Sequence, residues 1–378
     1  MNIYLDNAAT TPLDPQVLEA MLPYLSDHFG NPSSIHSTGR KVRTAIEGSR
    51  KKIAAILSVS PSEIVFTSGG TEADNAFITG AVEANDIACI ITSKIEHPAV
   101  LQTVLALEKA NKVSVKYVHT LSTGDVDLVH LEELLTKNPK ALVTLMHVNN
   151  EIGNLTDLAE VANLTNKFDA VLHSDMVQSM GHLKINPIKI GLDGLSAGAH
   201  KFHGPKGVGF MYVRKGLKVP QFITGGGQER GHRGGTENVY GIVGMAKALE
   251  LATDNLDYDI DYISGLKLQM IEELNKSIRG IAYNGNSANL KKSLYTILNV
   301  SMPPSINNEM LLFNLDLNGI SASGGSACAS GASVSSHVLN ELAVDVNRQA
   351  VRFSFSRFNN ETEIDTVVKK FIEIYNAD

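Results

Sequence analysis

Lys201 follows a run of small and apolar residues (194–199) and precedes a glycine-rich turn (204–207). A lysine that leaves a buried strand among glycine, alanine and histidine is poorly solvated when charged, and this favours the neutral amine that attacks a carbonyl carbon. We therefore interpret Lys201 as a Schiff-base lysine. On its own, such a stretch would more often hold a surface lysine at a strand end, so the interpretation depends on the rest of the chain.

A second candidate is the glycine-rich turn 67–72, which follows an apolar run and opens a predicted helix at 73–84. Glycines at a helix N-terminus leave backbone N–H groups and the positive end of the helix dipole open to an anion. Gly70 and Thr71 could therefore form a cup for a phosphate group, to which Thr71 adds a hydroxyl. Taken alone, Thr71 could equally be the N-cap of that helix.

Further polar residues follow other predicted strands. His97 could stack on an aromatic ligand as a neutral imidazole and move protons, and Asp175 could face a ring nitrogen, although it could also cap a helix expected after it. Gln178 could reach a ring hydroxyl from the same helix edge. With Lys201, these are the parts of a pyridoxal 5′-phosphate (PLP) site, because a carboxylate keeps the pyridine nitrogen protonated and lets the ring withdraw electrons.

The stretch 321–336 consists of Ser, Gly, Ala and Cys apart from Val334, so it has little with which to anchor itself by burial. We expect Cys328 to lie on a mobile loop there as a reactive thiol; without the lysine site it could be an incidental thiol in a linker. Cys89, within an apolar run, is expected in the core. Two distant cysteines without CxxC spacing indicate neither a disulfide framework nor a structural zinc site, and we predict no metal site.

These residues need a scaffold that brings strand ends together. Apolar runs alternate with helical segments, a pattern typical of a parallel α/β sheet. Its strands are predicted at 63–67, 87–92, 113–118, 141–148, 170–173, 194–199 and 207–213, and nearby helices at 16–24, 40–57 and 73–84. The connection 201–206 is too short for a parallel crossover, so the seventh strand is expected to run antiparallel. A second, α+β unit follows, with a helical stretch at 239–277, strands at 295–301 and 351–356, and a helix at 363–375.

The composition excludes several classes. A chain of 378 residues with 43% hydrophobic content can bury a large core. The net charge of −7 is spread over 33 basic and 40 acidic residues, so no basic stripe indicates nucleic acid or a membrane surface as a partner. The sequence shows no signal peptide at its start and no apolar run near the ~18 residues of a membrane span. We expect a cytoplasmic location.

Several motifs occur in order along the chain: YLDNAATTP (4–12), GNPSS (30–34), TSGGTEADN (67–75), NNEIG (149–153), HKFHGPKG (200–207), GGGQERGHRGGTEN (225–238) and RFS (352–354). Together they resemble, almost end to end, the cysteine desulfurases of the NifS/IscS type. These are fold-type I PLP enzymes of the class V aminotransferase-like group. The resemblance implies a homodimer and PLP as the cofactor.

By this resemblance, Lys201 forms the Schiff base, Asp175 pairs with the ring nitrogen and His97 stacks on the ring. The catalytic residues are then Lys201, Cys328 and His97, and the cofactor site also includes Gly70, Thr71, Asn150, Asp175, Gln178, Gly198, His200 and Thr236. The other subunit supplies Thr236. Arg352 is expected to clamp the substrate carboxylate, a task for which a guanidinium is better suited than an ammonium, unless it is a surface arginine of a strand. Asn31 would assist.

The resemblance also implies the reaction. Lys201 yields its place to the amine of L-cysteine, Cys328 takes the sulfur as a persulfide, and L-alanine is released. The loop would then carry the sulfur to an acceptor such as an iron–sulfur scaffold protein. The large PLP-binding domain is expected at 13–255, and a small α+β domain carrying Cys328 at 1–12 and 256–378.

The sequence departs from the family pattern in three places. Gly198 stands where the family usually has a serine that binds the cofactor phosphate, the stretch 333–337 replaces a Leu-Glu-Pro-Ser type of sequence, and Gly70 replaces a frequent alanine. The alternatives are a selenocysteine lyase or a PLP aminotransferase on the same fold, and a sulfur-relay or scaffold protein of low turnover. The Cys328 loop argues against transamination, which needs no thiol.

Overall fold

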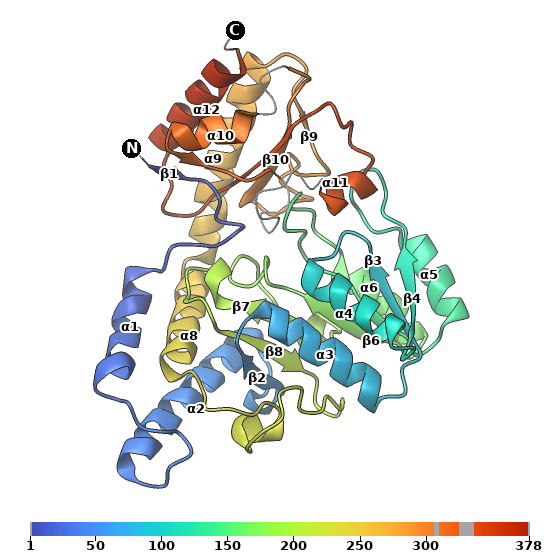
Figure 1. Cartoon of the computed structure of the whole chain (residues 1–378), viewed down its shortest axis with the longest axis vertical. Coiled ribbons are helices and arrows are strands. Elements are labelled where there is room, and N and C mark those ends of the chain that lie inside the picture. Colours follow the sequence, from blue (N-terminus) through green and yellow to red (C-terminus); the bar gives the residue numbers. More distant parts are fainter. Residues whose placement is uncertain (1, 306–309, 325–335, 377–378) are drawn as a thin grey trace.

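The structure, a computed structural model, describes residues 2–305, 310–324 and 336–376. Within these residues, seven strands form one sheet in the order β2-β8-β7-β6-β5-β3-β4 (Figure 1). The strands are β2 (Ile64–Thr67), β3 (Cys89–Ser93), β4 (Ser114–Val118), β5 (Leu142–Thr144), β6 (Val171–Asp175), β7 (Gly194–Gly198) and β8 (Gly209–Val213). β8 runs antiparallel to β2 and β7, and the remaining pairs are parallel. The predicted mostly parallel sheet is confirmed.

One strand is shorter than predicted. The run 141–148 forms strand only at Leu142–Thr144. Beyond it, the backbone N–H groups of Leu145 and His147 still donate to His173 and Asp175, so the chain stays beside β6 while it turns toward the strand ends.

Helices cover both faces of the sheet, because alternate residues of each strand point to opposite sides. Ile90 of β3 packs with the helices of one face, and its neighbours Cys89 and Ile91 pack with those of the other, so the predicted burial of Cys89 is confirmed. The first face carries α3 (Gly70–Ala84) and α4 (Pro98–Lys109). The second carries α1 (Pro15–Ser26), α2 (Ser37–Leu57), α5 (Leu128–Lys137), α6 (Leu158–Lys167) and α8 (Val239–Asp254).

Glycines let α3 approach the sheet closely. A Cβ on Gly194 would lie 2.0 Å from the ring of Phe77, and one on Gly209 would lie 2.8 Å from Gly69. Without these side chains, α3 rests on β7 and β8. α3 also begins three residues earlier than expected, so that Gly70 and Thr71 belong to its first turn.

The C-terminal part forms smaller sheets. β10 (Ile297–Ser301) pairs antiparallel with β9 (Ala282–Tyr283) and β12 (Ala350–Ser354), and β1 (Ile3–Tyr4) pairs in parallel with β11 (Ile320–Ser321). The helices here are α9 (Leu256–Ser277), α10 (Leu311–Leu317), α11 (His337–Glu341) and α12 (Glu361–Tyr375). Short helical turns elsewhere are α7 (Pro187–Ile190) and the 3-10 turns η1 (Pro61–Glu63), η2 (Ala199–Lys201) and η3 (Gln228–Gly231).

The predicted helical stretch 239–277 consists of two helices, because the chain leaves helical geometry at Asn255 (φ −98°, ψ 3°). Ile3, Leu5 and Ala8 pack in the apolar cluster of β10, β12 and α12, apart from the two clusters of the large sheet. These separate clusters support the division of the chain at 12/13 and 255/256, which stays a prediction. None of the helices described is long and apolar enough to cross a membrane.

Candidate active site

A cavity of about 370 Å³ opens at the carboxyl ends of the sheet strands. It collects most of the residues predicted from the sequence: Gly70, Thr71, His97, Asn150, Asp175, Gln178, His200, Lys201 and Arg352. Ligands of parallel α/β sheets bind at this edge. The predicted residues therefore form one site, although they come from segments far apart in the chain.

Lys201 enters the cavity from η2, the short turn after β7. Its Nζ donates to the carbonyl oxygens of Ala8 at 2.5 Å and Ala9 at 2.9 Å. Gln178 Nε2 donates to the same Ala8 oxygen at 2.9 Å. The backbone just after β1 thus holds the amine and the amide side by side at the cavity wall.

Asp175 ends β6 and is 6% exposed. Its Oδ1 accepts the backbone N–H of Val177 at 2.8 Å. The expected helix does not follow: residues 177–182 form turns, because this bond closes an Asx-turn, so Asp175 is not a helix cap and Gln178 does not lie on a helix. Burial raises the pKa of Asp175, while His97 and Lys201 oppose that rise.

His97 is the N-cap of α4: its Nδ1 accepts the backbone N–H of Ala99 at 3.1 Å. A neutral ring that accepts at Nδ1 carries its proton at Nε2. Burial lowers the pKa of His97, although the charge of Asp175 opposes this. A neutral ring fixed by its cap is suited to stack on an aromatic ligand.

The first turn of α3 forms the end of the cavity that suits an anion. Gly69 adopts φ 156°, which favours glycine, and no side chain caps the helix. His200 is held by a hydrogen bond between its Nδ1 and Thr10 Oγ1 at 3.1 Å, and burial lowers its pKa to about 4. A Cβ on Gly198 would lie 3.4 Å from the backbone nitrogen of Gly70, so Gly198 is adjacent to this turn.

Arg352 of β12 is 2% exposed, which excludes the surface alternative. It donates through Nη1 to the backbone oxygen of Asn150 and through Nη2 to Asp6 Oδ1, both at 2.8 Å. Within the described residues, its buried Nε has no partner. A buried arginine that lines a cavity is suited to bind a carboxylate.

The residues present fit PLP. Open backbone N–H groups lie at one end of the cavity, the carboxyl of Asp175 lies within it, and the amine of Lys201 enters it. Burial raises the pKa of the Asp175 carboxyl, and its Oδ1 accepts the backbone N–H of Val177, so a protonated ring nitrogen would supply the charge that favours the ionised form of Asp175.

Some predicted residues lie elsewhere. Asn31 is exposed, and its Oδ1 accepts the backbone N–H of Ser33 at 2.9 Å. Thr236 is also exposed and lines a separate cavity of about 200 Å³ with Ser68 and Asn238. Neither lines the cavity of Lys201 in the same chain. Cys328 lies outside the described residues.

Other titratable residues at this cavity were missed from the sequence. Asp74 is buried one turn after Thr71, and burial followed by the charge of Asp175 raises its pKa. Glu151 accepts a hydrogen bond from Ser336 at 2.5 Å, and His337 lines the same wall. Helical spacing from Thr71 could have indicated Asp74; no local pattern indicates that His337 returns to this site.

Among the described residues, no cluster of three or more His, Cys, Asp or Glu side chains could hold a metal ion.

Comparisons with known proteins agree with this geometry. The aminotransferase class-V family matches residues 3–367. A cysteine desulfurase IscS from Dictyoglomus turgidum is 42% identical over 98% of this chain and 94% of its own length. A solved structure of a NifS-like protein is 38% identical, with a TM-score of 0.91 over 99% of both chains. Another, described as SspA in complex with cysteine, is 32% identical, with a TM-score of 0.82 over 95% of this chain and 100% of its own.

Proposed function

Because the chain belongs to the aminotransferase class-V family and, within it, to the cysteine desulfurases, we propose that the residues of the Lys201 cavity carry out its reaction together with Cys328. The enzyme depends on PLP and removes the sulfur of L-cysteine, leaving L-alanine. The observation that supports this assignment of roles is the convergence of Lys201, Asp175 and His97 on one cavity.

When bound, PLP supplies a carbonyl carbon for amines and a ring that withdraws electrons from the α-carbon of the substrate. Lys201, whose Nζ lies at the cavity wall, would hold PLP through that carbon and would also serve as the group that takes and returns protons. Asp175 would hold the proton of the ring nitrogen. His97 would stack on the ring, and Gln178 and Asn150 would bind near the ring hydroxyl.

The first turn of α3 would hold the phosphate through its backbone N–H groups, including that of Gly70. Thr71 and His200 would also bind the phosphate, and Gly198 lies beside this turn. Arg352, which also lines this cavity, binds the carboxylate of L-cysteine. A substrate held by Arg352 is oriented for attack on its sulfur.

Cys328 supplies the nucleophile. Its thiolate attacks the sulfur of the substrate, a sulfur–sulfur bond forms, and the carbon–sulfur bond breaks with its electron pair passing to the carbon skeleton. A proton delivered to that carbon completes L-alanine, and the sulfur remains on Cys328 as a persulfide. A reducing thiol or an acceptor protein then removes it.

The experiment that tests this is the release of sulfide and alanine from L-cysteine with a reducing thiol, compared between wild type and Cys328→Ala at equal PLP occupancy. Wild type should release equal amounts of both products, and the variant neither. If the variant matches wild type, Cys328 is not the nucleophile. Selenide release from selenocysteine, measured in parallel, gives the preference between the two substrates.

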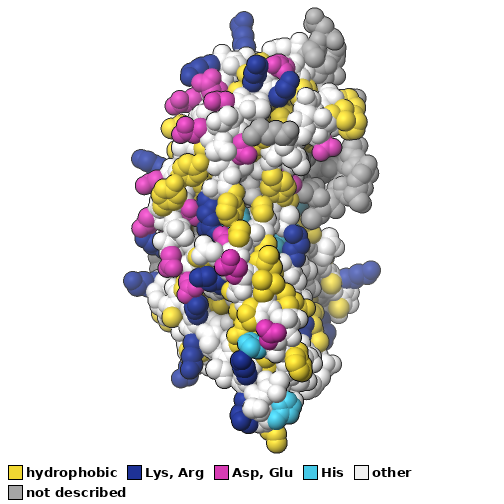
Figure 2. Space-filling view, turned by 90° about the vertical axis from the view of Figure 1, so that its left-hand side faces the viewer, with side chains coloured by type: hydrophobic (Ala, Val, Ile, Leu, Met, Phe, Trp, Pro, Cys, Tyr) yellow, Lys and Arg dark blue, Asp and Glu magenta, His cyan; other side chains and the backbone are white. Residues whose placement is uncertain are grey.

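We also propose a homodimer. Thr236 and Asn31 do not reach the cavity of their own chain, so a second copy is needed to use them. Exposed hydrophobic side chains mark a suitable face on α1 and the loop after it: Leu18, Leu22, Leu25, Phe29 and Ile35. Figure 2 shows hydrophobic side chains gathered on the lower half of this side of the molecule. Sedimentation should give a dimer, and Leu22→Glu should weaken it.

The sulfur acceptor is proposed to be a protein, such as an iron–sulfur scaffold. The support is the IscS name of the relative from D. turgidum. A cytoplasmic location stays a prediction. Transfer of radiolabelled sulfur from Cys328 to purified candidate scaffolds would identify the acceptor, and retention of the label on the enzyme would exclude a candidate.

A further inference from the structure

The segment 225–238, which carries Thr236, has little apolar side chain to bury. Half of its residues are exposed, and the side chains that it buries are the carboxylates of Glu229 and Glu237. Apolar packing therefore contributes little to its position. Charged contacts hold it instead.

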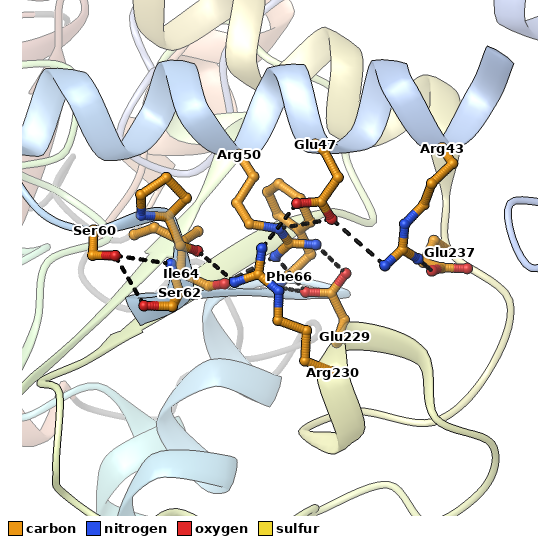
Figure 3. Close-up of polar contacts among 11 residues, drawn as sticks. Arg43, Glu47, Arg50, Ser60, Ser62, Ile64, Phe66, Glu229, Arg230 and Glu237 are labelled. Carbon is orange, nitrogen blue, oxygen red and sulfur yellow. Dashed lines mark hydrogen bonds and ion pairs between the residues drawn. The ribbon is translucent and has the colours of Figure 1, made fainter. Parts of the chain in front are cut away.

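The strongest of these contacts joins Glu229 to Arg50 of α2 (Figure 3). It is two-pronged, with Nη1 to Oε2 at 2.7 Å and Nη2 to Oε1 at 2.8 Å. Both side chains are 2% exposed, and the guanidinium carbon lies 4.4 Å from the centre of the Phe66 ring. A buried pair of this geometry is rigid and strong.

The pair also completes an open sheet edge. β2 is the outermost strand beside β8, so alternate backbone groups of β2 face away from the sheet. Arg50 Nη1 donates to the carbonyl of Ile64 at 2.8 Å, and Glu229 Oε2 accepts the N–H of Phe66 at 2.8 Å. Glu229 is thereby fixed against a strand as well as against a helix.

The backbone around Glu229 shows the same constraint. Glu229 and Arg230 adopt φ values of 46° and 57°, in the left-handed region that non-glycine residues rarely occupy. Consecutive residues remain there only where surrounding contacts hold them.

Further ion pairs continue the attachment on either side of Thr236. Arg230 pairs with Glu47 at 2.9 Å, and Glu237 pairs with Arg43 at 3.1 Å, both on α2. Arg233 pairs at 2.9 Å with Glu72, in the first turn of α3 next to Thr71. Thr236 thus lies on a short span between anchored residues.

We propose that Arg50 and Glu229 are positioning residues for Thr236: their buried pair fixes the segment 225–238 so that Thr236 meets the cofactor phosphate in a second copy of this chain. The inference rests on the proposed function, in which two copies share the site. A hydroxyl on a fixed segment loses little conformational freedom when it binds the phosphate. The affinity for PLP therefore depends on the Arg50–Glu229 pair that fixes the segment.

The test is PLP affinity, measured by titrating the apoenzyme and following cofactor absorbance, for Thr236→Val, Glu229→Gln and the double variant. Each single variant should weaken PLP binding roughly tenfold, the loss expected for one hydrogen bond to a charged group. The double variant should bind PLP as weakly as one single variant, because Glu229 acts through Thr236.

Lys52→Gln is the matched control. Lys52 also lies on α2 and forms an ion pair, but with Glu250 of α8 at 2.7 Å, outside the segment 225–238. The Lys52→Gln variant should bind PLP with the same affinity as wild type. If Glu229→Gln does not fold as a dimer, Arg50→Lys replaces it, since lysine keeps a charge opposite Glu229 but loses the two-pronged contact.

The outcomes separate the two proposals. An unchanged affinity in Thr236→Val rejects the contact between copies, and the inference with it. Weakened binding in Thr236→Val with unchanged binding in Glu229→Gln rejects the inference alone. The inference is also rejected if the losses of PLP affinity in the two single variants add up in the double variant. Glu229 would then affect PLP binding independently of Thr236.

Discussion

The carboxylate of Asp6 holds the guanidinium of Arg352, with 2.8 Å between Oδ1 and Nη2. Ser323 donates to the same oxygen at 2.8 Å. Segments from the two ends of the chain therefore meet at the wall of the active site. Because Arg352 is buried and lines the cavity, this contact helps to orient its guanidinium there.

Asp6→Ala should raise the KM for L-cysteine roughly tenfold with a smaller change in kcat, because Arg352 loses the partner that orients it for the substrate carboxylate. Asp6→Asn is the control: its amide oxygen can still accept from both Arg352 and Ser323, so its KM should stay closer to wild type. Steady-state kinetics decides the matter. A fall in kcat at unchanged KM would show that Asp6 acts elsewhere.

Gly198→Ser should slow the loss of PLP and leave activity intact. Gly198 has extended dihedral angles (φ −133°, ψ 124°) that serine adopts, and its Cβ would lie 3.4 Å from the Gly70 nitrogen, at the anion-binding turn. A hydroxyl there adds a bond to the phosphate, expected to contribute roughly 1.5–3 kcal/mol to cofactor binding. PLP retained during dialysis is the measurement, with Gly198→Ala as the control for the added Cβ. Faster loss from the serine variant than from wild type would contradict the prediction.

The sheet and much of the site could be predicted because the signals are local. Apolar runs alternate with helical segments, and a polar residue directly after such a run, like Asp175, must lie at the strand end where ligands bind. The short link after Lys201 was enough to predict the antiparallel β8. Family resemblance then supplied roles that spacing alone could not assign.

The remainder depends on contacts between distant segments. Asp6 accepts a hydrogen bond from Arg352, which is 346 residues away in the sequence, and Glu151 accepts one from Ser336, which is 185 residues away. A local sequence pattern therefore cannot reveal either contact. The helix expected after Asp175 failed for a different reason: the Asp175 side chain takes the N–H of Val177 and turns the chain. The helix propensities of these residues did not reveal that the Asp175 side chain would form this turn.

Glu96 should make the protein less stable as the pH rises. It is 1% exposed, its Oε1 accepts from Ser93 and from the Met146 N–H, and burial raises its pKa to about 8 from 4.5. The folded state therefore favours the protonated acid, and its stabilisation, fully present below pH 4.5, is lost as the pH rises toward 8.

Glu96→Gln should remove this loss, which is on the order of 4 kcal/mol, because an amide imitates the protonated acid at every pH. Urea unfolding at pH 5.5 and 8.5 measures it. The variant should gain stability over wild type at the higher pH and little at the lower. An equal difference at both pH values would show that Glu96 does not titrate in this range.

Lys267 should have the opposite dependence. It is fully buried in α9, where its Nζ donates to Ser293 Oγ at 2.9 Å and to the Leu294 carbonyl at 3.0 Å. Among the described residues no carboxylate pairs with it, and burial lowers its pKa to about 7 from 10.5. Between these values the unfolded chain binds more protons, so stability falls as the pH drops from 10.5 toward 7.

Lys267→Met should therefore stabilise the protein relative to wild type more at pH 7 than at pH 10, since methionine needs no proton and fills a similar volume. Urea unfolding at both pH values gives the difference. Lys276→Met is the matched control on the same helix: Lys276 is 65% exposed and pairs with Glu273, so its substitution should change stability little at either pH. If the gain from Lys267→Met is the same at pH 7 and pH 10, then Lys267 is charged throughout this range. Its hydrogen bonds to Ser293 and Leu294 would then be sufficient to keep the ammonium buried.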